Sequence, residues 1–435
     1  MVRGVVSETE SSHEPLVDAA APSLGLDGIG VYVHFPWCLK KCPYCDFLSV
    51  AVEDGAGKPT DAETVRRRLP SRAYADSVIA ELHARVASAW PQGRGLPRLK
   101  TIFFGGGTPS LWEAPQLARV IDTIFQAFDA SAPEVTIECN PSSVDERYFA
   151  QLLQAGVNRV SIGVQALDQR RLQFLGRWHE AKDGLGAIEA ARRAGVSRIS
   201  ADLIHGVSEQ TPQQACSDAL GVVQAGAVHV SAYLLTIEAG TRFGARKRKG
   251  QLPLLSDELM ADSYEAVRTS LLQQNFQHYE ISNFGRPGEA SQHNLGYWLG
   301  RDYLGLGTGA VGTVELPTAR VRYKNLLVPE RYLELWQEKG PRDAFSEGLA
   351  DREIISAQTA VDEALMLGLR TTYGIDLSEM AAKRGAEPNS RQRQTLNRLQ
   401  EEGWLFQSDG RWRLRAEKWL LSDAVARRLL SSSDQ

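Results

Sequence analysis

The chain has 435 residues, of which 43% are hydrophobic and 23% charged, and its formal net charge at pH 7 is −4. This length and composition predict a large globular domain with a smaller appendage. The slight negative charge argues against a general nucleic-acid binder, and no apolar run approaches the ~20 residues needed to span a bilayer.

The first 28 residues are polar and acidic and lack the apolar core of a signal peptide, so we expect a disordered leader over 1–28. Five cysteines, three of them bunched, fit a reducing compartment and a metal site better than a disulfide framework. The predicted location is therefore the cytoplasm, with peripheral contact to a membrane left open.

The bunched cysteines follow a predicted strand over 30–35 and have Cys-x3-Cys-x2-Cys spacing, at Cys38, Cys42 and Cys45. A structural zinc site would need a fourth Cys or His nearby, whereas Cys139 and Cys216 are solitary and far away in sequence. The spacing favours a four-iron cluster with three irons held by the protein and the fourth open to a substrate or cofactor. Zinc and incidental clustering are the alternatives.

A strand–helix unit repeats along the next two hundred residues. The segment 52–70 is rich in Gly, Asp, Lys and Arg and is predicted to loop over the surface, and apolar residues at helical spacing predict a helix over 71–90. Further predicted strands cover 99–104, 134–138, 159–165, 198–204 and 229–236, and the predicted helices cover 114–128, 145–155, 168–174, 181–194, 212–225 and 257–274.

Six strands that alternate with helices are typical of a parallel α/β sheet, whose strands read as near-continuous apolar runs. Polar residues gather where the strands end: after the cysteine loop come Gly105–Thr108, Glu138 and Gln165, with Asp202 inside the fifth strand. In a parallel barrel these ends form one mouth, where we expect a ligand site. An open doubly wound sheet is the alternative, although the glycine run lacks the Gly-x-Gly-x-x-Gly form. Taken singly, the glycines could be a tight turn, the polar residues caps, and Arg177 a solvated helix-end charge.

Two motifs carry a resemblance to a known family. Tyr32-x-His34-x-Pro36-x-Cys38-x3-Cys42-x2-Cys45 and Gly105-Gly-Gly-Thr-Pro109 resemble the radical S-adenosylmethionine (SAM) superfamily, in the branch that holds oxygen-independent coproporphyrinogen III dehydrogenases and HemW-type haem chaperones. The resemblance implies a partial (β/α)6 TIM-like barrel, a [4Fe-4S] cluster on the three cysteines, and SAM chelated by the open iron. Its implied SAM residues are Tyr32, Gly106, Gly107, Thr108, Glu138, Gln165, Arg177 and Asp202.

Two features favour the chaperones within that branch. The dehydrogenases carry a fourth cysteine two residues after the third, where this chain has Phe47. The stretch from His293 to Trp298 reproduces the His-Asn-x-x-Tyr-Trp motif of the chaperones, which implies His293 as the ligand of the haem iron, with Tyr297 and Trp298 as flat apolar faces for the porphyrin. Taken alone, a His-Asn pair is more often a structural hydrogen-bonding element. Val311 stands where the family has His.

The pattern changes near residue 330, so we predict a barrel with its haem-motif extension over 29–329 and a second domain over 330–435. Helices over 350–370, 390–402 and 422–430, with an Asp-Gly hairpin over 405–414, indicate a small winged-helix-like α/β domain. Three arginines there, Arg391, Arg393 and Arg398, would serve nucleic-acid contact in one interpretation. We favour a lid or docking module, because such charges usually form a solvated face.

The sequence thus predicts a carrier that holds haem as cargo and passes it to an acceptor apo-haemoprotein, in solution or at a membrane, without binding nucleic acid. The alternative is an enzyme, the coproporphyrinogen III dehydrogenase that decarboxylates propionates in porphyrin biosynthesis. A regulatory nucleic-acid binder is a remote third hypothesis.

Overall fold

A computed structural model describes residues 27–52, 61–338, 340–341 and 343–430 of the chain. The predicted leader over 1–28 lies, except for its last two residues, outside the described residues. No helix within these ranges is long and apolar enough to cross a membrane.

One sheet of 12 strands, in the order β14-β13-β12-β11-β1-β4-β5-β6-β7-β8-β10-β9, organises the larger part of the molecule. At one edge, β10 (Asn283–Gly285) pairs antiparallel with β8 and with β9 (Gln277–Glu280). All six predicted strands are present at the centre of the sheet, and neighbours along the chain pair in parallel. They are β1 (Ile29–Phe35), β4 (Arg98–Gly106), β5 (Asp129–Cys139), β6 (Arg159–Gln165), β7 (Ile199–His205) and β8 (His229–Leu234). Across these six strands the order runs one way, from β1 to β8, without reversing. This confirms the partial barrel and excludes the doubly wound alternative, in which the order reverses at a switch point.

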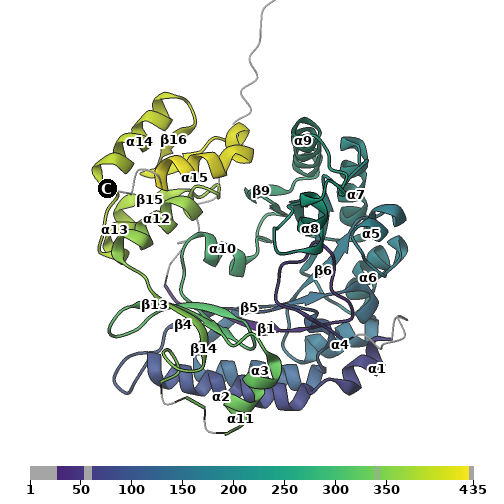
Figure 1. Cartoon of the computed structure of the whole chain (residues 1–435), viewed down its shortest axis with the longest axis vertical. Coiled ribbons are helices and arrows are strands. Elements are labelled where there is room, and N and C mark those ends of the chain that lie inside the picture. Colours follow the sequence, from purple (N-terminus) through teal and green to yellow (C-terminus); the bar gives the residue numbers. More distant parts are fainter. Residues whose placement is uncertain (1–26, 53–60, 339, 342, 431–435) are drawn as a thin grey trace, which may run out of the picture.

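Helices follow these strands and cover the outer face of the sheet (Figure 1). They are α2 (Ser71–Ala89), α3 (Ala114–Ala127), α4 (Glu146–Gln154), α5 (Gln169–Phe174), α6 (Ala181–Arg193), α7 (Pro212–Ala225) and α9 (Asp257–Gln273), all close to their predicted ranges. Helix α7 shows how the sequence sets such bounds. Thr211 and Gln214 form a capping box at its start, and Gly226, with φ of 118°, ends it in the left-handed conformation.

The two faces of the parallel strands differ in chemistry, which the prediction of near-continuous apolar runs missed. In β6, Val160, Ile162 and Val164 are fully buried on the outer face, against the helices. The alternate residues, Arg159 and Ser161, face a cavity inside the barrel. Because side chains alternate along a strand, the inner face can be polar while the outer face supplies the core.

An extension that the sequence did not predict continues the sheet beyond β1, where its first strand pairs with β1 in parallel and its own strands pair with each other antiparallel. It consists of β11 (Tyr303–Leu306), β12 (Val311–Glu315), β13 (Arg320–Asn325) and β14 (Leu349–Ile354). The predicted helix over 350–370 was therefore wrong in its first part, which forms the edge strand β14 paired with β13. The helix begins only after Ser356, whose side chain accepts a hydrogen bond from the Thr359 amide, as α12 (Ala357–Gly368).

The predicted surface loop over 52–70 was also wrong in part. Residues 53–60 lie outside the described ranges, but Ala62–Arg68 form helix α1, with the Asp61 side chain accepting from the Thr64 amide as N-cap. Val65 of α1 is buried in the main hydrophobic cluster, which explains why a charged segment folds here.

The C-terminal unit has the predicted three helices and hairpin, and it adds a short strand (Ile375–Asp376) and a helix (Leu377–Arg384) that the sequence did not predict. It contains α12, β15 (Ile375–Asp376), α13 (Leu377–Arg384), α14 (Ser390–Glu401), the hairpin β16 (Leu405–Ser408) and β17 (Arg411–Leu414), and α15 (Ser422–Leu430). Its own hydrophobic cluster begins at Val361, whereas α11 (Pro329–Glu338) and Phe345 belong to the barrel cluster. Because β14 also belongs to the barrel sheet, we propose that the two units divide after Ile354 rather than at residue 330.

Candidate functional site

The three bunched cysteines lie on a loop that is closed at its base. Strand β2 (Trp37–Cys38) pairs with β3 (Val50–Ala51), and the Val52 amide donates to the Cys38 carbonyl at 2.8 Å. All three thiols are free. Burial raises the pKa of the Cys38 thiol and raises that of Cys45 to about 11, so protons must leave before these sulfurs can bind metal.

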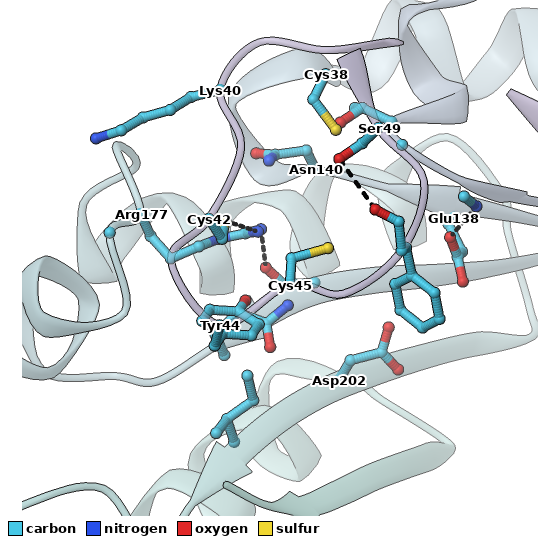
Figure 2. Close-up of a pocket in the computed structure, with 18 of the residues that line it drawn as sticks. Cys38, Lys40, Cys42, Tyr44, Cys45, Ser49, Glu138, Asn140, Arg177 and Asp202 are labelled. Carbon is cyan, nitrogen blue, oxygen red and sulfur yellow. Dashed lines mark hydrogen bonds between the residues drawn. The ribbon is translucent and has the colours of Figure 1, made fainter. Parts of the chain in front are cut away.

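These cysteines line one cavity of about 480 Å³ together with most of the predicted SAM residues, and Figure 2 shows several of them around it. The residues brought together are Cys38, Cys42, Cys45, Gly106, Gly107, Thr108, Glu138, Gln165, Arg177 and Asp202. They come from the cysteine loop, from the carboxyl halves of β4 to β7 and the residues that follow them, and, for Arg177, from the segment between α5 and α6. Tyr32 does not line this cavity. It lines a neighbouring one, with its hydroxyl 3.0 Å from His34 Nδ1.

The glycine run is more than a tight turn, because it allows backbone to approach backbone closely. The Gly107 amide donates to the Phe35 carbonyl at 2.7 Å, and a Cβ on Gly107 would lie 2.6 Å from the Trp37 oxygen. Gly106 has φ of 111°, and a Cβ there would meet the His34 ring at 2.5 Å. Any larger residue would therefore displace the start of the cysteine loop.

Two half-buried carboxyl groups, of Glu138 and Asp202, share the wall of this cavity. Glu138 Oε2 accepts from the Gly106 amide at 3.1 Å, and burial, followed by the nearby Asp202, raises the pKa of Glu138 to about 8. The two carboxylate oxygens of Asp202 lie 2.9 Å and 3.0 Å from the Ser161 hydroxyl. Burial raises the pKa of Asp202, against hydrogen bonds from Ser231 and Ser161. A cationic ligand would be attracted to this pair.

Arg177 connects the cysteine loop with β6 and is not a solvated helix-end charge. Its Nη1 lies 3.5 Å from Cys42 Sγ, and its Nη2 donates to the Gly163 carbonyl at 3.1 Å. Burial opposes its charge, but Tyr44 and Cys42 raise the pKa of Arg177 above its usual value. Gln165, at the end of β6, has φ of 68°, a left-handed conformation that costs free energy outside glycine and often marks a functional site.

A second cavity, of about 280 Å³, lies deeper inside the barrel. Phe47, Glu138 and Asp202 line both cavities. The helix that carries the predicted haem motif, α10 (Gln292–Trp298), closes the far end of the second cavity. In Figure 1 this helix lies on the opposite side of the sheet from α2 and α3. Glu134 on β5 holds it there, because Glu134 Oε1 accepts from the His293 amide at 3.1 Å.

His293 is buried, and both of its ring nitrogens are engaged. Nδ1 lies 2.8 Å from the Thr101 hydroxyl and Nε2 lies 2.8 Å from the Tyr297 hydroxyl, while the ring stacks on Phe103 at 5.0 Å between centroids. Burial, followed by the charge of Arg301, lowers the pKa of His293 to about 3, so the ring is neutral. The histidine is therefore a hydrogen-bonding element in the form that the structure describes.

The rest of the predicted haem motif divides between two places. Tyr297 lines the second cavity with His293, whereas Trp298 faces the C-terminal unit, where the Arg370 guanidinium lies 5.7 Å from its ring. Val311 lies on β12, paired with Lys324, and lines neither of the two cavities. Of the arginines on α14, Arg393 pairs with Glu387 and Arg398 with Glu402.

Sequence reasoning missed several residues of the site. Phe47 is 64% exposed and lines both cavities, at the position where the dehydrogenases have their fourth cysteine. Cys139, solitary in sequence, also lines the first cavity, with its thiol 3.8 Å from the Ile137 carbonyl. Ser161 and Tyr233 line both cavities, and their alternation with buried apolar residues along β6 and β8 was the available signal.

The donor set suits a cluster better than a single ion. Within the described ranges, no three His, Cys, Asp or Glu side chains are placed to hold one metal ion. Three cysteines on one loop, facing a cavity of about 480 Å³ with a guanidinium beside one sulfur, fit a larger group whose metals each take one thiolate. Glu138, Asp202 and the glycine backbone line the rest of the same cavity, so a second ligand has room beside the cluster.

Comparisons with known proteins agree with this geometry. Residues 32–218 match the radical SAM superfamily and residues 355–421 match the HemN C-terminal domain. The chain is 34% identical to the heme chaperone HemW of Escherichia coli over 353 residues, covering 79% of this chain and 87% of that protein. It is also 34% identical to the HemW of Lactococcus lactis over 345 residues, covering 79% and 82%. The solved structure of coproporphyrinogen III oxidase (HemN) from Escherichia coli has a TM-score of 0.71 at 19% identity, covering 94% of this chain and 91% of that one, and so shares the fold.

Proposed function

This chain belongs to the HemW family of the radical SAM superfamily, and from that premise we propose that it is a haem chaperone that binds a [4Fe-4S] cluster and SAM. It would hold haem as cargo and pass it to an acceptor haemoprotein. The family membership supports the haem part of the proposal, and the cavity beside the cysteines supports the cofactor part.

The observation that carries the cofactor proposal is the common cavity of the three thiols and the polar strand ends. When bound, the cluster supplies an iron with an open coordination position for the amino and carboxylate groups of SAM. The chain's own residues bind the rest of that molecule. Glu138 and Asp202 attract its positive charge, the backbone of Gly106 and Gly107 allows close approach, and Arg177 offsets negative charge on Cys42.

His293 remains the proposed ligand of the haem iron, and the structure adds a condition to that proposal. Its Nε2 must first release the Tyr297 hydroxyl, because a neutral imidazole offers one lone pair and a hydrogen bond at 2.8 Å occupies that nitrogen. The Thr101 hydroxyl on Nδ1 then fixes the ring orientation, as a hydrogen-bond partner commonly does for a ligating histidine.

The rival function is the coproporphyrinogen III dehydrogenase. Phe47 argues against it, since the side chain at the position of the fourth cysteine is a phenyl ring that can neither bind metal nor move a proton. At the mouth of both cavities, this exposed ring offers a flat apolar face to a porphyrin instead.

Two assays on the anaerobically reconstituted full chain test the proposal. Haem titration should give a Soret shift that the His293→Ala variant weakens, and coproporphyrinogen should remain unchanged in the presence of SAM and a reductant. Conversion of coproporphyrinogen at a useful rate would reject the carrier function. Equal haem binding by His293→Ala would reject the ligand assignment while leaving the chaperone function standing.

A further inference from the structure

The floor of the second cavity carries a cation that the proposed SAM and haem contacts do not use. Arg159 is the first residue of β6 and is only 2% exposed, yet it lines the cavity of about 280 Å³. Its one hydrogen bond among the described residues runs from Nη1 to the Glu289 carbonyl at 3.0 Å. No ion pair joins it to an acid in those ranges.

Two other buried arginines, Arg85 and Arg171, and the half-buried Arg198 have acidic partners, whereas the buried Arg301 has no ion pair among the described residues. Arg85 lies 2.7 Å from Glu81, Arg171 lies 2.8 Å from Asp218, and Arg198, also on the barrel floor, pairs with Glu134 at 2.9 Å. Burying an unpaired charge costs several kcal/mol, so buried charges are ordinarily paired. Arg159, like Arg301, has no ion pair among the described residues, but it faces a cavity, where a ligand can supply negative charge beyond that of Asp202 on the same cavity wall.

A second unpartnered donor lies beside it. Thr136 on β5 is the register partner of Arg159, and both side chains face the cavity. The Thr136 hydroxyl is buried and has no hydrogen-bond partner. His229, on the same floor, is already bonded at both nitrogens, to Ser200 and Tyr279 at 2.7 Å each, so it does not compete for a ligand.

One guanidinium and one hydroxyl suit a ligand with a single negative charge. The fork of an arginine matches the two oxygens of a carboxylate. A dianion such as phosphate would meet Glu138 and Asp202 on the same cavity wall, and the repulsion would oppose binding. A cavity of about 280 Å³ lies below the ~300–1,000 Å³ range of ligand pockets, so it admits a carboxylate arm or a small acid rather than a porphyrin ring.

We propose that the cavity floor is a carboxylate-binding site in which Arg159 and Thr136 hold the two oxygens. The carboxylate comes either from a propionate arm of haem, in which case the inference rests on the proposed haem function, or from a free small carboxylic acid. In the first case the cavity as described holds only the arm, and ligation of the haem iron by His293 still requires the opening at Tyr297 that the proposed function demands.

The test compares haem with haem dimethyl ester, which lacks both carboxylates, in titrations of the reconstituted full chain. A charge-assisted hydrogen bond predicts that wild type binds haem at least about tenfold more tightly than the ester. Arg159→Gln should reduce that ratio to about one, and Arg159→Lys should retain part of it. Arg198→Gln, which removes a floor arginine that already has acidic partners, is the matched control and should keep the wild-type ratio.

A second arm uses sodium propionate without porphyrin, against sodium chloride at equal ionic strength. Propionate should raise the melting temperature of wild type and of Arg198→Gln, but not that of Arg159→Gln. If only this arm responds, the ligand is a free acid. If wild type fails to bind haem, the proposed function fails while this arm still decides the site.

Should Arg159→Gln fail to fold, Thr136→Val and Arg159→Lys take its place, and each should lower the ratio of haem to ester affinity or the response to propionate. An ester that binds as tightly as haem, together with no stabilisation by propionate, would overturn the proposal.

Discussion

Replacement of Arg177 by methionine tests the proposed SAM site most sharply. The substitution keeps the aliphatic stem and removes the contact with Cys42 Sγ at 3.5 Å and the hydrogen bond to the Gly163 carbonyl at 3.1 Å. In the proposed site the Arg177 guanidinium also donates to bound SAM, and loss of one hydrogen bond from a charged group costs about 1.5–3 kcal/mol. At about 1.4 kcal/mol per tenfold change, the SAM dissociation constant should rise roughly ten- to a hundredfold. The iron content should not change, because the three thiols hold the cluster.

Equilibrium dialysis of SAM against anaerobically reconstituted protein, with iron and sulfide measured in the same samples, provides the assay. Arg171→Met is the matched control, because Arg171 pairs with Asp218 at 2.8 Å and lines neither cavity. It should lower stability and leave SAM affinity unchanged. A SAM dissociation constant for Arg177→Met within twofold of wild type, at equal iron content, would refute the assignment.

Three further predictions concern haem, acid stability and the core. Tyr297→Phe removes the hydroxyl that occupies His293 Nε2 at 2.8 Å, so haem should bind more tightly than to wild type in titration; unchanged affinity would speak against His293 as the ligand. The pKa of His293 is about 3 in the folded chain, below its value in the unfolded chain, so the unfolded state takes up a proton first as pH falls. The stability that the neutral His293 contributes is therefore fully present above about pH 6.5 and is lost progressively toward pH 3. Urea unfolding of wild type and His293→Asn across that range should show the weaker pH dependence in the variant, and equal slopes would contradict this. Glu81→Ala leaves Arg85 buried without its partner at 2.7 Å and should lower the free energy of unfolding, measured by chemical denaturation, by about 3–5 kcal/mol. A loss below about 1 kcal/mol would show that this ion pair is dispensable.

The sequence predicted the parallel strands and the cluster of polar residues at the mouth of the barrel because both depend on local rules. Strand alternation and helical periodicity act within a few residues, and the carboxyl ends of parallel strands meet at one edge, so Glu138, Gln165 and Asp202 could be grouped without coordinates. The resemblance added Arg177, whose contact with Cys42 crosses 135 residues of sequence and has no local signature.

Long-range contacts explain what the sequence did not predict. The predicted haem motif, which forms α10, lies inside the barrel because the His293 amide donates to Glu134, 159 residues away in sequence. A contact over that distance has no local signature. Residues 350–354 were predicted as the start of a helix, but pairing with β13 makes them part of a strand. The polar inner face of β6 was visible in its alternation, although the expectation of a strand buried on both faces concealed it.

The measurement that tests the central claim most directly is haem transfer from the reconstituted, haem-loaded chain to an apo-haemoprotein. The two proteins are separated by a membrane permeable to small molecules or mixed directly, and the Soret band of the acceptor is followed in both arrangements. We expect the rate of haem transfer on direct mixing to exceed the rate of transfer across the membrane, because the carrier delivers haem by contact. Equal rates in the two arrangements, or haem that stays on the chain, would contradict it.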